Sequence, residues 1–409
     1  MVRLPAPVRP LFPYLKPAYT AATRAVAPVT VALSQRRGRQ LPTGSVATLA
    51  QAAARTGGRS VVARPAETIT RQPPPAGPAD AIFAAELTER LSPTVVAELP
   101  DGRVLGPHHA LIAGNGELVQ DLSIYFGTRR PREHPLFLHP FPGEPVHIAG
   151  RLGVLASRGD VNYYHFLIDV LPRLAVLAAC PEIEPPTRWY VPAASRFQRE
   201  LLERVGLTGD RIVDATTVPH VRADTLVVPA PPALTVVNPP WVVGHLRETL
   251  LEPGLACVPG RGIYVTRGAS ANNRAVRNED AVIAALQQRG FDIVDPGQMS
   301  VSDQIRAFAE ADVIVSAHGA ALVNLVFASP GATVIELFPA GALVPDYWKL
   351  ATGVPGLDYR YLLGVGRRRS AGRSRMLVSD VVVDVVALSE IVDSLRDGTA
   401  TVSFEEPAR

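Results

Sequence analysis

The second half of the sequence alternates short apolar runs with helical segments, and this alternation limits the fold more than any other feature. Strands separated by helices of this length form a parallel sheet with helices on both faces. The pattern predicts strands at Ile263–Thr266, Phe291–Val294, Val313–Ser316 and Thr333–Leu337, and helices at Glu279–Arg289, Ser302–Ala309 and Ala320–Phe327. A similar alternation from Asp160 to Val228 begins with a helix at Asn162–Ala179. We therefore expect an α/β chain with two Rossmann-like halves that face a cleft, and with a small β-containing extension at the N-terminus.

Composition divides the chain into three parts. Residues 1–79 form an extension and linker rich in Ala, Pro and Arg, with one short helix at Ser45–Arg55 and a stiff Pro73-Pro74-Pro75. An α/β domain follows over residues 80–250, and short β-type runs fill its first part. Residues 251–409 form the second α/β domain, which a C-terminal helix closes. Because the extension offers little surface to bury, we expect the two domains to fold without it.

Charge and cysteine content exclude several classes of protein. The formal net charge is +3 and the basic runs are short, so the sequence indicates no nucleic-acid partner. Two cysteines without metal-ligand spacing, Cys180 and Cys257, exclude a disulfide framework and a zinc site, and predict reduced thiols in a cytoplasmic protein. The longest apolar segment, residues 313–338, is interrupted by polar residues and proline, which indicates a buried core and no membrane span. We expect the N-terminal extension to contact the inner face of a membrane or to join copies of the chain.

The helix expected at residues 162–179 carries a polar stripe of unusual composition. Asn162, His165, Asp169 and Arg173 are spaced to lie along one side, opposite a broad apolar face. An imidazole, a carboxylate and a guanidinium in one line are suited to proton abstraction beside an anionic leaving group. The alternative is an amphipathic helix whose His–Asp pair is an ordinary surface contact, and the helix taken alone favours that alternative.

Further candidates follow or lie within strands of the second half. His318 and Gly319 stand between a strand and a helix, where backbone N–H groups bind phosphate; the alternative for His318 is a cap packed in the core. Glu336 lies within a strand and is costly to bury unless a ribose diol or an ion pair with Arg267 satisfies it. Arg267 and Arg274 follow the strand at residues 263–266, and guanidinium groups at a strand end suit a diphosphate.

Four of these segments together resemble the hallmark segments of glycosyltransferase family 61, in the same order and spacing. They are the helix Asn162–Leu174, the segment Tyr264–Arg274, the run His318-Gly319-Ala320-Ala321-Leu322-Val323-Asn324 and the strand Val334–Phe338. The resemblance covers residues 80 to 365. It implies the two-domain GT-B architecture, a nucleotide-sugar donor such as a UDP-sugar, and transfer with inversion of the anomeric centre. The Ala-, Arg- and Pro-rich composition suggests a cell-surface glycan or glycolipid as the acceptor.

The resemblance also implies roles for the candidate residues. Asp169 would be the base that deprotonates the acceptor hydroxyl, with His165 supporting it or lining the acceptor site. The donor would be held in the second domain by Arg267, Arg274, His318, Gly319, Asn324 and Glu336, and the domain at residues 80–250 would take the acceptor. The sequence contains no Asp-x-Asp, which is the usual metal-holding motif of the other large glycosyltransferase architecture. We therefore expect a metal-independent enzyme that needs no cofactor beyond its co-substrate.

Other classes have less support. A dehydrogenase would need G-x-G-x-x-G at the start of a helix, a nucleoside triphosphatase G-x-x-x-x-G-K-[ST], and a serine hydrolase G-x-S-x-G, and the sequence has none of them. A non-catalytic nucleotide- or glycan-binding protein with the same fold stays open. A donor-hydrolysis assay separates that alternative from an enzyme.

Overall fold

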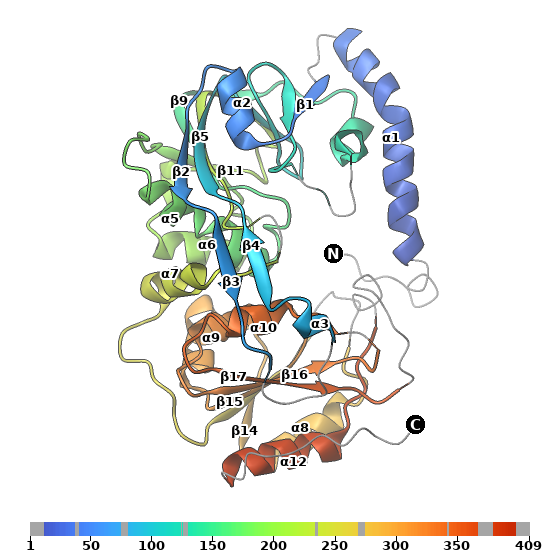
Figure 1. Ribbon diagram of the computed structural model, residues 1–409, viewed down its shortest axis with the longest axis vertical. Helices are drawn as coiled ribbons and strands as arrows, with labels where there is room; N and C mark the ends of the chain where they lie inside the picture. Colours follow the sequence, from blue (N-terminus) through green and yellow to red (C-terminus); the bar gives the residue numbers. More distant parts are fainter. Residues whose placement is uncertain are drawn as a thin grey trace. The chain divides into compact units, whose positions relative to one another are not determined.

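The chain folds into two compact units (Figure 1). The computed structural model describes residues 12–36, 41–74, 81–123, 125, 130–233, 236–268, 275–341, 343–366 and 379–397. The C-terminal unit comprises residues 1–13, 68–89 and 237–409, and the N-terminal unit comprises residues 14–67 and 90–236. Both units combine helices with a β-sheet, which confirms the α/β class. The GT-B arrangement of the two units stays a prediction.

A five-stranded parallel sheet forms the centre of the C-terminal unit. Its strands are β13 (Gly262–Val265), β14 (Phe291–Val294), β15 (Val313–Ala317), β16 (Thr333–Phe338) and β17 (Asp358–Leu363). They lie in the order β14-β13-β15-β16-β17, and every neighbouring pair is parallel. Because β14 lies on one side of β13 and β15 on the other, the winding of the sheet reverses between β13 and β15. In sheets of this kind, ligands bind outside the carboxyl ends of the strands at that point.

Helices cover both faces of this sheet (Figure 1). One face packs on α8 (Glu279–Gln287) and α12 (Val385–Arg396) through a shared apolar cluster. The other face carries η6 (Ala320–Phe327), with α7 (Pro240–Leu250), α9 (Val301–Glu310) and α10 (Asp346–Ala351) packed around it. The strands and helices expected here all occur, except that residues 320–327 form a 3₁₀-helix and no α-helix. Residues 322–327 are all buried, so tertiary packing decides the local conformation over helix propensity.

The N-terminal unit contains a mixed sheet of ten strands. The path runs β1-β8-β7-β6-β12-β9-β10-β11, and β5 pairs with both β12 and β2. The bounds are β1 (Gly44–Val46), β2 (Ser60–Arg64), β5 (Thr94–Pro100), β6 (Arg103–Leu105), β7 (Ala110–Ile112), β8 (Glu117–Val119), β9 (Val146–Val154), β10 (Arg188–Val191), β11 (Ile212–Asp214) and β12 (His220–Pro229).

In this unit β12, β9, β10 and β11 form a parallel group, and β1 pairs parallel with β8. The strands β5, β6 and β7 pair antiparallel with their neighbours, in the part of the chain where the sequence predicts short β-type runs. Gly106 and Gly116 explain the difference. Both have positive φ, which glycine adopts without steric cost, and they turn the chain back into hairpins between β6 and β7 and between β7 and β8.

The helix expected at residues 162–179 consists of three pieces. They are α4 (Tyr163–His165), the π-helical turn η4 (Phe166–Val170) and α5 (Arg173–Ala178). In the wide turn the N–H of Leu171 donates to the carbonyl of Phe166 at 3.1 Å, five residues back. Pro172, which has no N–H to donate, follows this turn and separates it from α5. Elsewhere in the unit lie α2 (Leu49–Arg55), α6 (Arg196–Arg204), η2 (Pro131–Glu133), η3 (Pro135–Leu138) and η5 (Gly209–Arg211).

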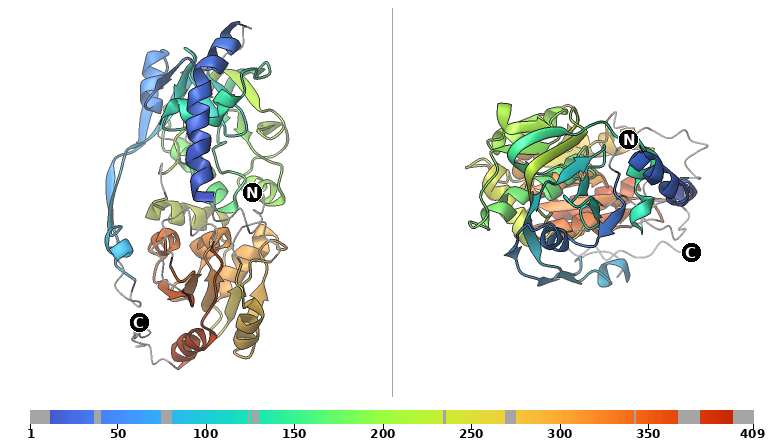
Figure 2. Two further views of the ribbon diagram at one scale, coloured as in Figure 1. Left: turned by 90° about the vertical axis from the view of Figure 1, so that its right-hand side faces the viewer. Right: turned by 90° about the horizontal axis from the view of Figure 1, so that it is seen from above.

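Residues before position 80 are part of the fold, which argues against the expectation that both units fold without them. Strand β1 pairs with β8 and β2 pairs with β5, and α2 buries Leu49, Ala52 and Ala53 completely in the core of the N-terminal unit. A further helix, α1 (Phe12–Arg36), lies along the outside of this unit (Figure 2). The sequence pattern does not predict α1, because Pro17 and Pro28 lie inside this helix.

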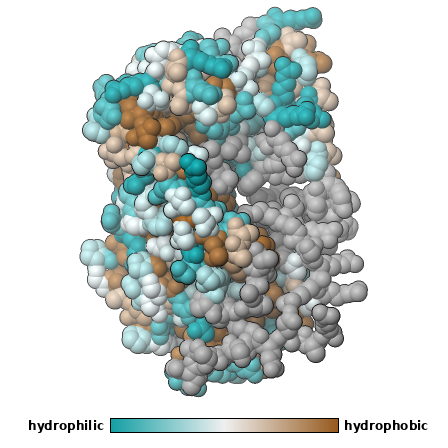
Figure 3. Space-filling view, in the orientation of Figure 1, coloured by the Kyte–Doolittle hydropathy of each residue, from teal (hydrophilic) through white to brown (hydrophobic). Residues whose placement is uncertain are grey.

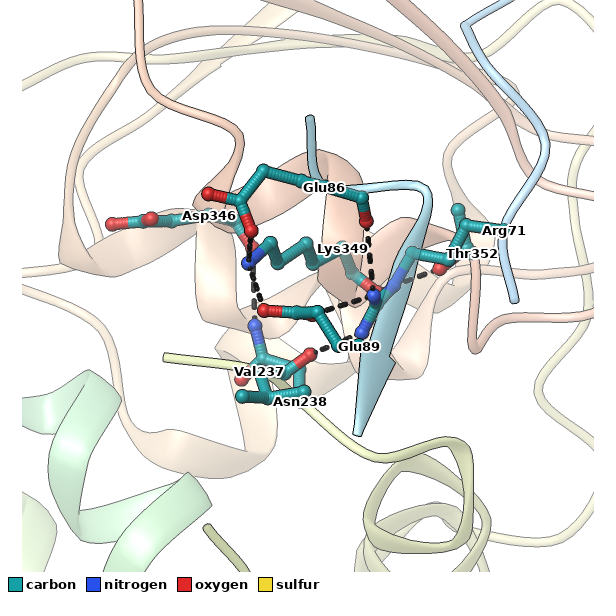
Figure 4. Close-up of polar contacts among 8 residues, drawn as sticks. All are labelled: Arg71, Glu86, Glu89, Val237, Asn238, Asp346, Lys349 and Thr352. Carbon is teal, nitrogen blue, oxygen red and sulfur yellow. Dashed lines mark hydrogen bonds and ion pairs between the residues drawn. The ribbon is translucent and has the colours of Figure 1, made fainter. Parts of the chain in front are cut away.

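Residues 68–89 belong to the C-terminal unit, whereas the bounds drawn from the sequence divide them between the extension and the first domain. They include most of the two-stranded sheet of β3 (Glu67–Thr70) and β4 (Thr88–Leu91), and α3 (Ala81–Ala84). Lys349 of α10 is buried, and its Nζ lies 2.7 Å from Oε2 of Glu86 and 2.6 Å from Oε1 of Glu89 (Figure 4). Arg71 lies 2.6 Å from the other oxygen of Glu89. Because loss of one partner would leave a buried charge uncompensated, this cluster fixes α10 firmly.

Within the described residues, no helix is long and apolar enough to cross a membrane. Both cysteines are free thiols, as the sequence predicts, and Cys180 is buried.

Candidate functional site

Two of the predicted donor-binding segments meet at the carboxyl edge of the C-terminal sheet. Arg267 follows β13, and His318 and Gly319 follow β15, on the adjacent strands where the winding reverses. Nη1 of Arg267 donates to the carbonyl oxygen of His318 at 2.6 Å. A Cβ atom added to Gly319 would lie 2.5 Å from that Nη1, so a larger residue at this position would displace the guanidinium from the neighbouring strand end.

Glu336 of β16 is fully buried beside this edge, and both of its carboxylate oxygens have partners. Nδ1 of His318 lies 2.5 Å from Oε1, and the hydroxyl of Tyr359 donates to Oε2 at 2.6 Å. Burial and the nearby charge of Glu336 raise the pKa of Tyr359 well above its ordinary value, so the hydroxyl keeps its proton. Glu336 therefore holds the His318 ring in one orientation, with Nδ1 toward the carboxylate. His318 and Tyr359 thus satisfy the Glu336 carboxylate, for which the sequence predicted a ribose or Arg267 as the partner.

The remaining donor-side candidates lie in different surroundings. Burial lowers the pKa of the Arg267 guanidinium, while Tyr347, Glu279, Tyr264 and Asp380 act in the opposite direction. Asn324 is fully buried in η6, and its Nδ2 donates to Oε1 of Gln304 at 3.0 Å, which links η6 to α9. Its predicted contact with a donor stays a prediction. Arg274 lies outside the described residues.

The second group of candidates follows the carboxyl end of β9 in the N-terminal unit. In the sheet β9 lies between β12 and β10. The chain passes from β9 through α4 and α5 to β10 on one side and later returns to β12 on the other, so the winding of the parallel part reverses beside β9. Nδ1 of His165 lies 2.7 Å from Oδ2 of Asp169, and the two side chains are 21% and 28% exposed. Gly159, with φ of 100°, lies against the His165 ring, where an added Cβ would be 3.0 Å from Cδ2. The turn after β9 therefore supports the ring while both side chains remain open to a substrate.

The polar stripe expected on this helix is wrong for Arg173. Its side chain is 2% exposed, and Nη1 donates to the carbonyl oxygens that end β9, including that of Leu155 at 3.0 Å. Burial lowers its pKa to about 10, while Asp169 and Asp160 act in the opposite direction. The wide turn η4 alters the helical spacing between Asp169 and Arg173, which sequence periodicity does not foresee. Asn162 caps α4, where its Oδ1 accepts from the N–H of Tyr164 at 2.9 Å.

The sequence pattern did not predict a group of aromatic and basic side chains in the same unit. The ring centroids of His108 and Tyr125 are 4.8 Å apart, both lie 6.2 Å from His134, and Arg158 stands over the Tyr125 ring at 5.8 Å. Burial lowers the pKa of Arg158 to about 10, and the Asp169 charge, together with Tyr125, opposes that shift. The one available signal was the density of histidines, six of nine between residues 108 and 165.

His134 in this group carries a buried donor that is unsatisfied. Its Nδ1 accepts from the N–H of Leu136 at 3.1 Å, and burial together with nearby positive charge lowers its pKa to about 3. The proton of the neutral ring is therefore on Nε2, which is buried and has no hydrogen-bond partner among the described residues. Across those residues, no group of three or more His, Cys, Asp or Glu side chains could hold a metal ion.

Comparison with known proteins identifies the class to which this geometry belongs. The family model named Glycosyltransferase 61 matches residues 163–335, from the first residue of α4 to β16. The protein O-linked-mannose beta-1,4-N-acetylglucosaminyltransferase 2 of Canis lupus familiaris and that of Homo sapiens are each 35% identical to this chain over 106 residues, and that of Xenopus laevis is 34% identical over 105 residues. Each match covers 24% of this chain and 18% of the relative, so it concerns a small part of both proteins.

Residues 163–335, which include parts of both units, thus match the family model of glycosyltransferase family 61. This match confirms, for these residues, the resemblance seen in the sequence. The matched stretch contains His165, Asp169, Arg267, His318 and Gly319, and it ends one residue before Glu336.

Proposed function

We propose that this protein is an inverting glycosyltransferase that moves a sugar from a nucleotide-sugar donor, a UDP-sugar, to a hydroxyl group of a glycan or glycolipid. The observation that carries the proposal is the family 61 domain, whose residues include both polar groups at strand ends. The names of the relatives state a β-1,4 transfer of N-acetylglucosamine, which agrees with inversion of an α-linked donor. UDP-N-acetylglucosamine is therefore the first donor to test.

The donor is proposed to bind at the carboxyl edge of the C-terminal sheet. Arg267 supplies a guanidinium there, and the first N–H groups of η6 follow Gly319. Both can hold the diphosphate and stabilise the charge that develops as it leaves. Glu336 and Tyr359 act as positioning residues, because they are buried and act through His318.

The acceptor hydroxyl is proposed to lose its proton in the N-terminal unit. Asp169 acts as the base, and the hydrogen bond from His165 orients it. The hydroxyl oxygen attacks the anomeric carbon, the bond to the nucleotide diphosphate breaks, and the proton passes to Asp169. Cations and backbone N–H groups can balance the diphosphate charge, so we propose that transfer needs no metal.

Two measurements test this proposal. The first is release of the nucleotide diphosphate from UDP-N-acetylglucosamine and other nucleotide sugars, with and without a chelator. Turnover that persists under chelation supports metal-independent transfer. Activity that chelation removes contradicts metal independence, and tight binding without any turnover favours the non-catalytic binding protein.

The second measurement compares Asp169→Asn with a matched surface control. His147 and Asp224 form another His–Asp pair in the same unit, 2.9 Å apart and exposed, so Asp224→Asn breaks an ordinary contact of the same chemistry. We expect the transfer rate of Asp169→Asn to fall by about 10²–10⁴-fold and that of the control to stay near the wild-type value. Equal transfer rates in the two variants would show that the His165–Asp169 pair is an ordinary surface contact and that Asp169 is not the base.

A further inference from the structure

Helix α1 presents a stripe of apolar side chains that remain largely exposed in the described part of the chain. A narrow set of buried residues, among them Thr23, Ala27 and Ser34, holds the helix against the N-terminal unit. Beside them, large apolar side chains recur at spacings of four, seven, three and four residues, which places them along one side of the helix. They are Leu15, Tyr19, Val26, Val29 and Leu33, with exposed fractions of 49%, 40%, 40%, 61% and 40%. In Figure 3 brown and pale side chains lie among teal ones in this region of the surface.

The charged residues of α1 and of the sequence on both sides of it are all basic. Residues 1–66 contain ten arginines and lysines and no aspartate or glutamate, although the whole chain has a formal net charge of only +3. Within α1 itself no acidic residue occurs, and Arg36 ends the helix. Arg3 and Arg9 precede the helix in the sequence, and Arg37 and Arg39 follow it. The apolar stripe is therefore bracketed by positive charge.

We propose that α1 docks this protein on a lipid surface that carries negative charge. The stripe would enter the boundary between headgroups and acyl chains, and the basic residues at both ends would contact anionic headgroups. At 25 residues the helix is about 37 Å long, so it can lie in the plane of the surface along its whole length. The inference concerns membrane docking alone and does not depend on the proposed activity.

Charge favours a lipid surface over a second copy of the chain. Two paired helices of this kind would bring positive groups together and could form no ion pairs between acidic and basic flanking residues, because α1 has no acidic residue. Pro17 and Pro28 lie inside α1 and disturb the regular backbone that close packing between two long helices requires. An anionic surface complements the basic residues and accepts an irregular apolar stripe.

The test uses the full-length protein and flotation with vesicles, so it does not depend on enzyme activity. Vesicles of phosphatidylcholine alone are compared with vesicles that also contain phosphatidylglycerol. We expect binding to the mixed vesicles only, and release as the salt concentration rises. Replacement of Arg36, Arg37 and Arg39 by Gln should reduce the partition coefficient about fivefold for each residue.

A matched pair of variants isolates the apolar contribution. Val26→Gln with Val29→Gln removes two side chains of the stripe, whereas Ala21→Gln with Ala32→Gln changes two exposed positions of the same helix outside it. Neither pair alters the charge, and glutamine suits a helix. We expect the stripe variant to lose about tenfold or more in partition coefficient and the control to bind like the wild type. Circular dichroism checks that the helices are retained in both.

Three outcomes would overturn the proposal. Equal binding to neutral and anionic vesicles would remove the role of charge, and unchanged binding of the stripe variant would remove the role of α1. A dimer in light scattering without lipid, lost in the stripe variant, would identify a second copy as the occupant.

Discussion

Removal of one hydroxyl group, in Tyr359→Phe, tests whether the buried chain Tyr359–Glu336–His318 positions the candidate donor site. The hydroxyl donates to a carboxylate that is fully buried, so no water replaces the lost bond. A hydrogen bond to a charged group contributes about 1.5–3 kcal/mol, and we expect the free energy of unfolding to fall by that amount. Affinity for UDP should also fall, because Glu336 loses its hydrogen bond from Tyr359 and then fixes the orientation of the His318 ring less firmly.

Tyr264→Phe is the matched control, because it also removes a tyrosine hydroxyl that donates to a glutamate in the same unit. That bond, to Glu279 at 3.0 Å, has a companion from Thr266 at 2.8 Å, and Glu279 is partly exposed. Its loss should cost only about 0.5–1.5 kcal/mol. Urea unfolding and calorimetric titration with UDP measure both variants. The reasoning is refuted if the two variants lose equal stability, or if Tyr359→Phe binds UDP as the wild type does.

Three further predictions concern single groups or segments. Gly319→Ala should weaken UDP binding in calorimetric titration about tenfold or more, because the new Cβ displaces Arg267; unchanged affinity would show that this guanidinium does not hold the diphosphate. His134→Asn keeps an acceptor for the Leu136 N–H and removes a group whose pKa is about 3 in the folded chain. Below pH 6.5 the variant should therefore lose less stability in thermal melting than the wild type, because the unfolded histidine takes up a proton that the folded ring does not; equal pH dependence of the two proteins would contradict this. A chain that starts at Asp80 should be insoluble or melt far lower, since it lacks β1, α2 and β2; normal melting would show that these elements are dispensable.

The C-terminal half was predictable because its sequence pattern and its fold have the same cause. Each strand of a parallel sheet is buried on both faces, so it appears as a short apolar run between helices. The strand at Phe291–Val294 has the expected bounds, and the strand at Thr333–Leu337 extends by one residue. The positions of Arg267 and His318 follow from the strand ends, since adjacent parallel strands bring their carboxyl ends to one edge.

Partners distant in sequence could not be predicted in the same way. Tyr359 lies 23 residues beyond Glu336, and nothing in the pattern of β17 distinguishes its hydroxyl from that of Tyr361. Arg173 is spaced as a surface residue, but the π-turn and Pro172 place its side chain under the end of β9. The antiparallel strands of the N-terminal unit are short, and their pairing depends on turns and on contacts with β12, more than 100 residues away. Periodicity carries no information about such contacts.

The two candidate sites share one arrangement, in which a histidine near a strand end has a carboxylate on Nδ1. They differ in what surrounds the carboxylate. Glu336 is fully buried and takes a second hydrogen bond from Tyr359, so both of its oxygens are engaged and no substrate can reach them. Asp169 is 28% exposed, and the bond from His165 engages one of its oxygens. A general base must come within hydrogen-bond reach of the proton that it takes. Of the two carboxylates only Asp169 meets that condition, which is why base chemistry is proposed for Asp169 and a positioning role for Glu336.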